Sequence, residues 1–424
     1  MGSEQKSVLL QLAQSVLETT KTIVQQLHDT NQEEPSFDQN SPSIQGDANY
    51  EASRIELNEA ALSLVRLVNG PVNEYRRIHL VHYDIAAYQA ALELQLFRYV
   101  PLDGKISLSD LAHKVGMDED RCGRIIRLLA TQNIFNEVDT DVFEHTAGSA
   151  LIARDTDMEA MLLMQYDELH NASTATAQCI KDAPFVSDGT SCPFQTYYGK
   201  STYAWYAENP DKAARFAKAM AAITQMDQSI AMLCDDFPWG KLGAPGKVVD
   251  MGGGSGHVSM HLASHFDNLE FVVQDSNRSA LAEGRAKVGA DIAPRIKFMH
   301  HDFFGEQTIT DANAFFLRQC LHNWNDDDCI KVIRALVPAL EKCKPGTRLL
   351  INDTILPERN EMSKYEEYLS RQVDMCMFVV AGAKERSRKQ FEKILKEADS
   401  RLEVVKVHGT RTMGLLEVCL RGQS

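Results

Sequence analysis

The sequence predicts an α/β protein in which a mostly parallel sheet of seven strands follows a largely helical N-terminal half. Before Gly246, apolar residues recur at helical spacing over long stretches. After it, short runs rich in β-branched and aromatic residues alternate with helical segments, which is typical of a parallel sheet with crossover helices. Only a turn separates the last two runs, so one of them should be antiparallel. The seven runs are KVVDMG (247–252), LEFVVQD (269–275), IKFMHHDF (296–303), NAFFLRQCL (313–321), TRLLINDTIL (347–356), LEVVKVHG (402–409) and GLLEVCLR (414–421).

The composition argues against several classes of protein. Lys and Arg total 44 against 59 Asp and Glu, and the resulting net charge of −15 disfavours a nucleic-acid or anionic-membrane partner. The nine cysteines include no C-x-x-C pair, so neither a disulfide framework nor a metal site is indicated. No apolar run is long enough to span a bilayer, and the N-terminus lacks the layout of a secretion signal. We therefore expect a cytoplasmic protein without a metal.

Residues 1–53 are expected to form an amphipathic helix and a flexible linker. Apolar residues from Leu9 to Leu27 recur at helical spacing and form one stripe. The residues that follow are polar, contain Pro and Gly, and cannot bury enough apolar surface to fold alone. The stripe must pack against either the rest of this chain or a second subunit, and we favour the second subunit.

Residues 54–155 are expected to form a small domain with a winged-helix outline. Ser107 or Ser109 can cap a short helix that Gly116 ends, and Asp118 can begin a second helix. The segment IFNEVDTDVFEHT that follows has the alternation and turn residues of a hairpin.

The second helix of this domain allows two interpretations. It carries Arg121, Arg124 and Arg127, which could contact DNA. However, the chain is acidic, and acidic residues are interleaved with these arginines. We therefore favour a dimerisation module, and expect a homodimer that binds no nucleic acid.

The glycine-rich segment VVDMGGGSGHVS (248–259) follows the first predicted strand directly. A P-loop or a dinucleotide-binding turn would need Gly at position 257, and His stands there. Instead, Asp250 precedes glycines at 252 and 254, which let a ligand approach the backbone closely. A carboxylate here would repel a pyrophosphate but attract the ammonium group of an amino acid. The turn therefore predicts a nucleoside that bears an amino acid.

Two more acids are predicted at the ends of the next two strands. Asp275 ends LEFVVQD, where a carboxylate can accept hydrogen bonds from both ribose hydroxyls. Asp302 ends the third strand beside Phe303, so that a carboxylate and an aromatic edge could meet an adenine. Three acids at successive strand ends would line the edge where α/β sheets bind their ligands.

These residues resemble the class I S-adenosylmethionine-dependent methyltransferases, specifically the small-molecule O-methyltransferases with a helical dimerisation domain. The resemblance covers roughly residues 54–422. VVDMGGGSGHVS resembles motif I, FVVQD the ribose-binding acid and HHDFF the adenine-side acid. LRQCLHNWNDDDC resembles the stretch with the catalytic histidine, and LINDTILPE and GAKERS resemble the segments that orient it.

The resemblance implies S-adenosylmethionine as cofactor. It also implies that residues 156–424 hold a helical substrate-pocket segment and a Rossmann-like methyltransferase domain. His322 would be the general base, and Asp353 and Glu385 its partners, although plant members usually have Glu in place of Asp353. The implied cofactor contacts are Asp250, Gly252, Gly254, Asp275, Asp302, Phe303 and Arg318.

The acceptor pocket is expected from the helical segment before the sheet and from the helix before GAKERS. Methionine-rich walls suit flat, apolar substrates because thioethers adapt to aromatic faces. This favours a hydroxylated aromatic or polyketide-like compound. The candidate residues, spaced so that each group can share one helix face, are Tyr203, Trp205, Met220, Ile223, Thr224, Met375, Met377 and Phe378.

Two alternatives belong to other classes. Some natural-product cyclases resemble O-methyltransferases and catalyse a pericyclic or dehydrative step, with the sulfonium as a fixed positive charge. A DNA-binding regulator is disfavoured because the sequence shows no basic face. We favour methyl transfer because the histidine and two carboxylate partners are all present.

Overall fold

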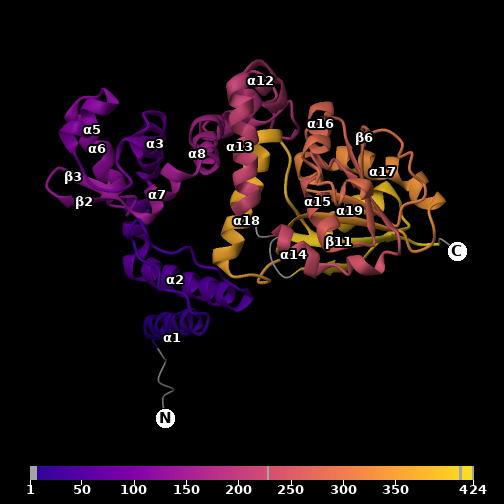
Figure 1. Ribbon diagram of the computed structural model, residues 1–424, viewed down its shortest axis with the longest axis horizontal. Coiled ribbons are helices and arrows are strands. Elements are labelled where there is room, and N and C mark those ends of the chain that lie inside the picture. Colours follow the sequence, from indigo (N-terminus) through magenta and orange to yellow (C-terminus); the bar gives the residue numbers. More distant parts are fainter. Residues whose placement is uncertain (1–6, 227–228, 410–412, 423–424) are drawn as a thin grey trace, which may run out of the picture. The chain divides into compact units, whose positions relative to one another are not determined.

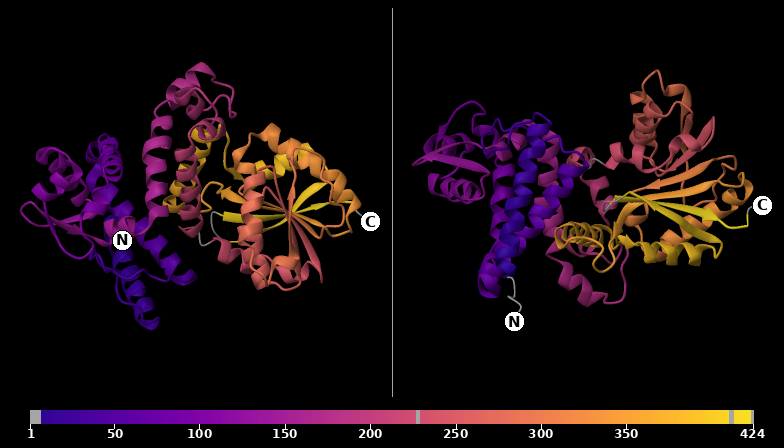
Figure 2. Two further views of the ribbon diagram at one scale, coloured as in Figure 1. Left: turned by 45° about the horizontal axis from the view of Figure 1, so that its top comes forward. Right: turned by 90° about the horizontal axis from the view of Figure 1, so that it is seen from below.

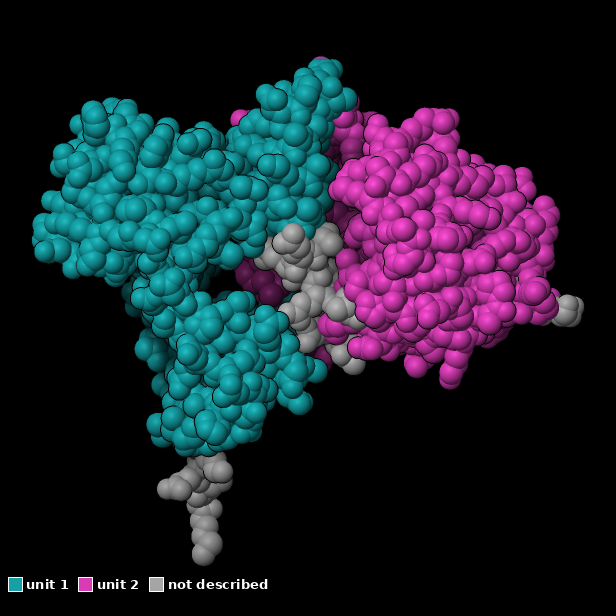
Figure 3. Space-filling model, viewed as in Figure 1, with its two compact units in different colours: residues 1–171, 206–223, 363–366 teal, residues 172–205, 224–362, 367–424 magenta. Residues whose placement is uncertain are grey.

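The structure is a computed structural model that describes residues 7–226, 229–409 and 413–422, apart from some side chains between 224 and 231 (Figure 1). The chain divides into two compact units (Figure 3). Unit 1 contains residues 1–171, 206–223 and 363–366, and unit 2 contains residues 172–205, 224–362 and 367–424. Within the described ranges, no helix combines the length and the apolar character that crossing a membrane requires.

Unit 1 begins with two long helices, α1 (Val8–Asp29) and α2 (Ala48–Ile78), which pack on each other. Gln26 Nε2 donates a hydrogen bond of 3.2 Å to Ser53 Oγ between them. The N-terminal helix therefore contacts its own chain, while several of its apolar side chains remain exposed. These are Val8, Leu9, Leu10, Leu17 and Val24.

The segment between α1 and α2 contacts the start of the helix at residues 147–154, because Asp38 forms a β-bridge with Thr146.

The winged-helix outline is confirmed in unit 1, where a three-stranded sheet has the order β1-β3-β2. Ser107, not Ser109, caps α5, because its hydroxyl accepts a hydrogen bond from the Asp110 amide. Gly116 ends this helix in the left-handed conformation, and Asp118 caps α6. The elements are α3 (Val81–Glu93), α4 (Leu96–Tyr99), β1 (Ile106–Ser107), α5 (Leu108–Val115), α6 (Glu119–Ala130), β2 (Phe135–Asp139), β3 (Val142–His145) and α7 (Ala147–Arg154).

Two of the three arginines of α6 form ion pairs within the domain. Arg127 forms ion pairs with Glu137 and Asp141, and Arg124 forms one with Asp120. These contacts neutralise two of the three basic residues that could have faced DNA.

Helical segments connect the winged-helix domain to the large sheet. They are α8 (Thr156–Leu163), a π-helical turn η1 (Met164–Leu169), α9 (His170–Ser173), α10 (Thr176–Asp182), α11 (Pro193–Tyr198), α12 (Thr202–Glu208), α13 (Pro210–Met226), α14 (Ser229–Asp236) and η2 (Trp239–Lys241).

Unit 2 is built on a sheet with the strand order β10-β11-β8-β7-β4-β5-β6, with β9 paired to β8. The strands between β8 and β6 are parallel, and β11 runs antiparallel to both of its neighbours, as expected for the last two runs. The strands are β4 (Gly246–Met251), β5 (Leu269–Asp275), β6 (Ile296–His300), β7 (Ala314–Arg318), β8 (Arg348–Leu356), β9 (Arg386–Ser387), β10 (Leu402–His408) and β11 (Met413–Leu420).

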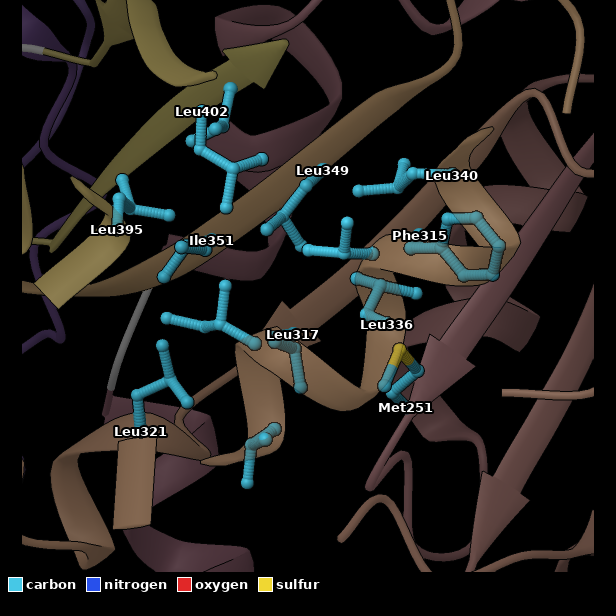
Figure 4. Close-up of a cluster of buried hydrophobic side chains, with 14 of the residues drawn as sticks. Met251, Phe315, Leu317, Leu321, Leu336, Leu340, Leu349, Ile351, Leu395 and Leu402 are labelled. Atoms are coloured by element: carbon cyan, nitrogen blue, oxygen red, sulfur yellow. The ribbon is translucent and has the colours of Figure 1, made fainter. Parts of the chain in front are cut away.

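Helices cover both faces of this sheet (Figure 2). Because successive strand residues point to opposite faces, Phe315 packs in one core and Phe316 in the other. The first core includes residues of α17 and α19 (Figure 4), and the second includes residues of α14, α15 and α16. The helices are α15 (His257–His265), α16 (Arg278–Lys287), η3 (Ala293–Arg295), η4 (Leu321–Asn323), α17 (Asp326–Lys342), α18 (Lys364–Ala381) and α19 (Arg388–Ala398).

Candidate active site

The glycine-rich turn lies between β4 and α15 and is held against the neighbouring strand. The amides of Gly252 and Gly253 both donate to the Gln274 carbonyl, at 2.8 and 3.0 Å. Gly252 has a φ of +74°, and a Cβ added there would lie 2.7 Å from Cys320 Sγ. A Cβ on Gly254 would meet no atom within 4 Å, so the turn is open at that residue. This combination of a fixed backbone and open space fits a ligand that contacts the turn closely.

Asp250 lies beneath the turn and is buried. Ser259 Oγ, from the first turn of α15, donates a hydrogen bond of 2.6 Å to Asp250 Oδ2. Burial raises the Asp250 pKa to about 6, and the charge of Asp275 acts in the same direction, against Ser259 and Arg318. The sequence predicted this carboxylate at the mouth of the turn, whereas the folded turn covers it.

Asp275, at the end of β5, fixes the turn from the other side. Its Oδ2 accepts a hydrogen bond of 2.9 Å from the Gly254 amide, and its Oδ1 accepts one of 2.7 Å from the Asn277 amide. Each carboxylate oxygen has a further lone pair, so both can still accept from a ligand hydroxyl.

Asp302 is exposed and lies two residues beyond β6, which ends at His300 rather than at Asp302 as the sequence predicted. Its Oδ1 accepts a hydrogen bond of 3.0 Å from the Phe304 amide, so the strand gives way to an Asx turn. Phe303 lies next to the glycine turn, because a Cβ on Gly252 would lie 3.2 Å from its ring. This places an aromatic edge beside Gly252 of the turn.

Arg318 ends β7 and donates a hydrogen bond to Asn352 Oδ1 on the adjacent strand β8. Its positive charge acts on both Asp250 and His257, which places it near the turn. Arg318 and the turn residues thus come together at the carboxyl end of the parallel strands.

His322 lies in a short 3-10 turn that follows β7. Its Nδ1 is 2.9 Å from Oε1 of Glu385, whose side chain has no exposed surface, while 15% of the His322 side chain is exposed. Nδ1 therefore donates its hydrogen to the carboxylate, and Nε2 is left as the atom that can accept a proton. The predicted pairing of His322 with a carboxylate is made by Glu385.

Asp353, on β8, acts on His322 through charge. It is fully buried, and within the described part of the chain neither of its carboxyl oxygens has a hydrogen-bond partner. Burial, together with the charge of Glu385, raises its pKa to about 7, against the positive charges of His322 and Arg386. Burial lowers the His322 pKa, but the hydrogen bond to Glu385 and the charges of Asp353 and Glu385 outweigh this and raise it overall.

Arg386 supports the histidine turn, and the sequence analysis assigned it no role. Its side chain is fully buried and donates to the carbonyls of Leu321 and Trp324, at 3.0 and 2.7 Å, on either side of His322. It also forms a 2.9 Å ion pair with Asp326 at the start of α17. The only signal for it in the sequence is its position directly after Glu385.

Asp374, on α18, also escaped the sequence analysis. Its Oδ1 accepts a hydrogen bond of 2.9 Å from the Glu385 amide. This bond fixes the backbone of the residue that orients His322.

The predicted acceptor residues are distributed over both units. Met220 and Ile223 lie on α13 in unit 1, and the side chain of Thr224 lies outside the described residues. In unit 2, Met375 and Phe378 line a cavity of about 440 Å³, and Met377 lies on the same helix.

Two further acceptor candidates in unit 2 are aromatic. Trp205 packs on Phe194 and Tyr198. Tyr203 has an exposed ring, but burial of its hydroxyl and the charges of Cys320 and Asp275 raise its pKa. The influence of these two residues places the Tyr203 hydroxyl on the side of the glycine turn.

Comparison with known proteins gives concordant results. A family model for O-methyltransferase domains matches residues 180–400, and one for O-methyltransferase dimerisation domains matches residues 78–155. The O-methyltransferase sol2 of Alternaria solani is 45% identical over 97% of this chain and 95% of its own length.

Solved structures share the fold. OxaC in complex with SAH and oxaline has a TM-score of 0.77 at 19% identity, covering 97% of this chain and 99% of OxaC. A protein described as a pericyclic reaction enzyme has a TM-score of 0.73 at 21% identity, covering 96% of this chain and 99% of its own. Because the family models and the curated relative span both regions, the chain belongs to the family of class I S-adenosylmethionine-dependent O-methyltransferases that have a dimerisation domain.

Proposed function

We propose that this O-methyltransferase methylates a hydroxyl group of an aromatic or polyketide-like compound, with His322 as the general base. The observation that carries the proposal is the hydrogen bond between His322 Nδ1 and the buried carboxylate of Glu385. It leaves Nε2 as the proton acceptor and provides a negative charge beside the imidazolium that forms.

The chemistry suits an assisted displacement. The cofactor, when bound, supplies a methyl group activated by a sulfonium. A phenol has a pKa of about 10 and an imidazole one of about 6.5, so the base cannot deprotonate the free phenol fully. His322 Nε2 instead takes the proton while the oxygen–methyl bond forms and the methyl–sulfur bond breaks. Asp353 and Glu385 stabilise the protonated imidazole and so favour this transfer.

The glycine turn and its surroundings would hold the cofactor. Gly254 leaves the backbone open to it, and Gly252 forms the close-packed part of the turn. Asp275 can accept from its ribose, and Asp302 and Phe303 are suited to its adenine. The buried charge of Asp250 would favour the ammonium end through the turn, and Arg318 would hold the strand end in place.

The acceptor would contact the methionine-rich and aromatic side chains. Met375 and Phe378 line a cavity whose wall also includes Asp374, which bonds to the backbone of Glu385. Met375 and Phe378 form an apolar part of this wall that suits a flat substrate, whereas Asp326, Asp374 and Lys384 make the rest of it charged. Tyr203, Trp205 and Met377, which belong to the same unit, are proposed to complete the acceptor site there.

We further propose that the protein is a homodimer. A dimerisation domain is present, and the helices before and within it expose many large apolar side chains, which in a monomer would contact water. On α2, in the turn after it and at the start of α3, these are Leu62, Val65, Leu67, Val68, Val72, Tyr75, Ile78, Leu80, Val81 and Tyr83.

The test uses S-adenosylmethionine with a labelled methyl group and a panel of hydroxylated aromatic and polyketide-like compounds. We expect label to appear in at least one acceptor, and the same compound with its hydroxyl already methylated to receive none. Tight cofactor binding without label transfer to any acceptor would overturn the proposal and favour a pericyclic or dehydrative reaction.

A further inference from the structure

Three metal-binding side chains outside the active site come together between α14 and α15. Cys234 belongs to α14, and His261 and His265 lie four residues apart on α15, so that both imidazoles share one helix face. The Cys234 sulfur and one ring nitrogen from each histidine all lie within 4.8 Å of one another. The two helices are in contact, and their labels are adjacent in Figure 1.

The hydrogen bonds of the two histidines leave nitrogen lone pairs available. His265 Nδ1 lies 2.9 Å from the His261 carbonyl oxygen, so it carries the hydrogen, and Nε2 is the bare nitrogen. Metal-binding histidines are commonly oriented in this way, by a hydrogen bond from the other ring nitrogen to a carbonyl. Among the described residues, His261 Nε2 is buried without a hydrogen-bond partner, which is costly for a polar atom.

The donor set indicates which ion would bind. One thiolate and two imidazoles suit zinc, which is tetrahedral with Zn–S near 2.3 Å and Zn–N near 2.0 Å. Such bond lengths require ligand atoms about 3.3–3.6 Å apart, so the three atoms, which lie within 4.8 Å of one another, would have to move closer together on binding. The His265 side chain is exposed. The same exposure leaves the fourth position to water.

We propose that Cys234, His261 and His265 form a zinc site that fastens α14 to α15. On binding, the Cys234 thiol releases its proton to solvent, and a Zn–S bond and two Zn–N bonds form. The ion takes no part in methyl transfer. Its effect is mechanical, because α15 begins at the end of the glycine turn and carries Ser259, which bonds to Asp250.

Separate packing roles explain Cys234, His261 and His265 less well than a shared metal ion does. Cys234 packs against the apolar core that includes Leu262, and this alone would explain a small apolar residue there. It does not explain a buried, unpartnered His261 nitrogen beside a thiol and a second imidazole. The spacing of cysteines alone could not reveal the site, because its ligands combine one cysteine with a distant H-x-x-x-H pair.

The test uses the full-length protein, stripped with a chelator and titrated with zinc chloride in a calorimeter. We expect one zinc ion per chain. With cobalt in place of zinc, we expect the absorption band of a thiolate bound to cobalt. Zinc should also raise the midpoint of thermal unfolding, because it binds the folded chain preferentially.

Substitutions at the site and elsewhere distinguish a specific zinc site from adventitious zinc binding. Cys234→Ser should abolish the thiolate–cobalt band, and His265→Ala should weaken zinc binding by at least about tenfold. His265 is exposed, so its substitution should not disturb folding. The matched controls Cys419→Ser and His28→Ala should bind as the wild type does. Absence of saturable micromolar binding in the wild type, or equal affinity in His265→Ala, would overturn the proposal.

Discussion

The Nδ1 atom of His322 and the Oε1 atom of Glu385 are 2.9 Å apart, and the Glu385 side chain has no exposed surface. A carboxylate in such surroundings is poorly solvated, so its attraction to a nearby positive charge is stronger than in water. The pair thus fixes the tautomer of the neutral imidazole. It also raises the pKa of His322. Both consequences can be measured.

Glu385→Gln should keep the imidazole oriented but remove the charge. The glutamine oxygen can still accept from Nδ1, whereas the pKa of His322 should fall because a negative neighbour is lost. We expect kcat to fall about 10- to 100-fold, and the acid limb of the kcat/KM profile to move to lower pH. Glu385→Ala, which also removes the orienting bond, should lower kcat further. An acid limb at the wild-type pH in Glu385→Gln would show that Glu385 does not set the His322 pKa.

Asp353 makes folding stability depend on pH. Its folded-state pKa is raised to about 7 by burial, so the folded protein favours the protonated carboxyl. The contribution to stability is complete below about pH 4, the unfolded-state pKa, and is lost as the pH rises to about 7. We therefore expect the free energy of unfolding of Asp353→Asn to fall less than that of the wild type between pH 4 and about pH 8. Urea denaturation at several pH values measures this, with the exposed Asp302→Asn as the control. Equal slopes for Asp353→Asn and the wild type would contradict the account.

The sequence predicted the parts of the site whose signals are local, but not how they pack. The strands and the glycine turn follow from short patterns, because strand ends and turns are determined by neighbouring residues. The pairing of His322 with a carboxylate was expected only from the resemblance to O-methyltransferases. Asp250 is buried beneath the turn, and Ser259 on the helix that follows donates a hydrogen bond to it. Arg386 acts through carbonyls far from it in sequence, and no single-chain pattern identifies such contacts.

Gly252 and Gly254 should respond differently to alanine. Both have positive φ, at +74° and +58°, so alanine strains the backbone at each. Only at Gly252 would the new Cβ collide, at 2.7 Å from Cys320 Sγ. We expect Gly252→Ala to weaken cofactor binding, measured by calorimetry, and to lower the unfolding midpoint more than Gly254→Ala does. Equal unfolding midpoints would show that the turn can yield to the extra carbon.

Arg386 should be a positioning residue for His322. Arg386→Lys keeps the charge but loses the fork that reaches both the Leu321 and Trp324 carbonyls. Leaving a buried hydrogen-bonding group without its partner costs about 1–3 kcal/mol of unfolding free energy, and we expect a loss of this size. In the variant, kcat should fall while the cofactor Kd stays unchanged. Arg388→Lys, in an exposed pair with Glu392, is the control and should change neither quantity. A wild-type kcat in Arg386→Lys would show that Arg386 does not position His322.

We expect His322 to accept the hydroxyl proton, and single-turnover transfer of a labelled methyl group measures its role directly. The rate would be compared between the wild type and His322→Ala, with a phenolic acceptor and saturating S-adenosylmethionine. We expect a decrease of about 10²- to 10⁴-fold in His322→Ala with unchanged cofactor affinity. Label transfer at the wild-type rate in His322→Ala would contradict it.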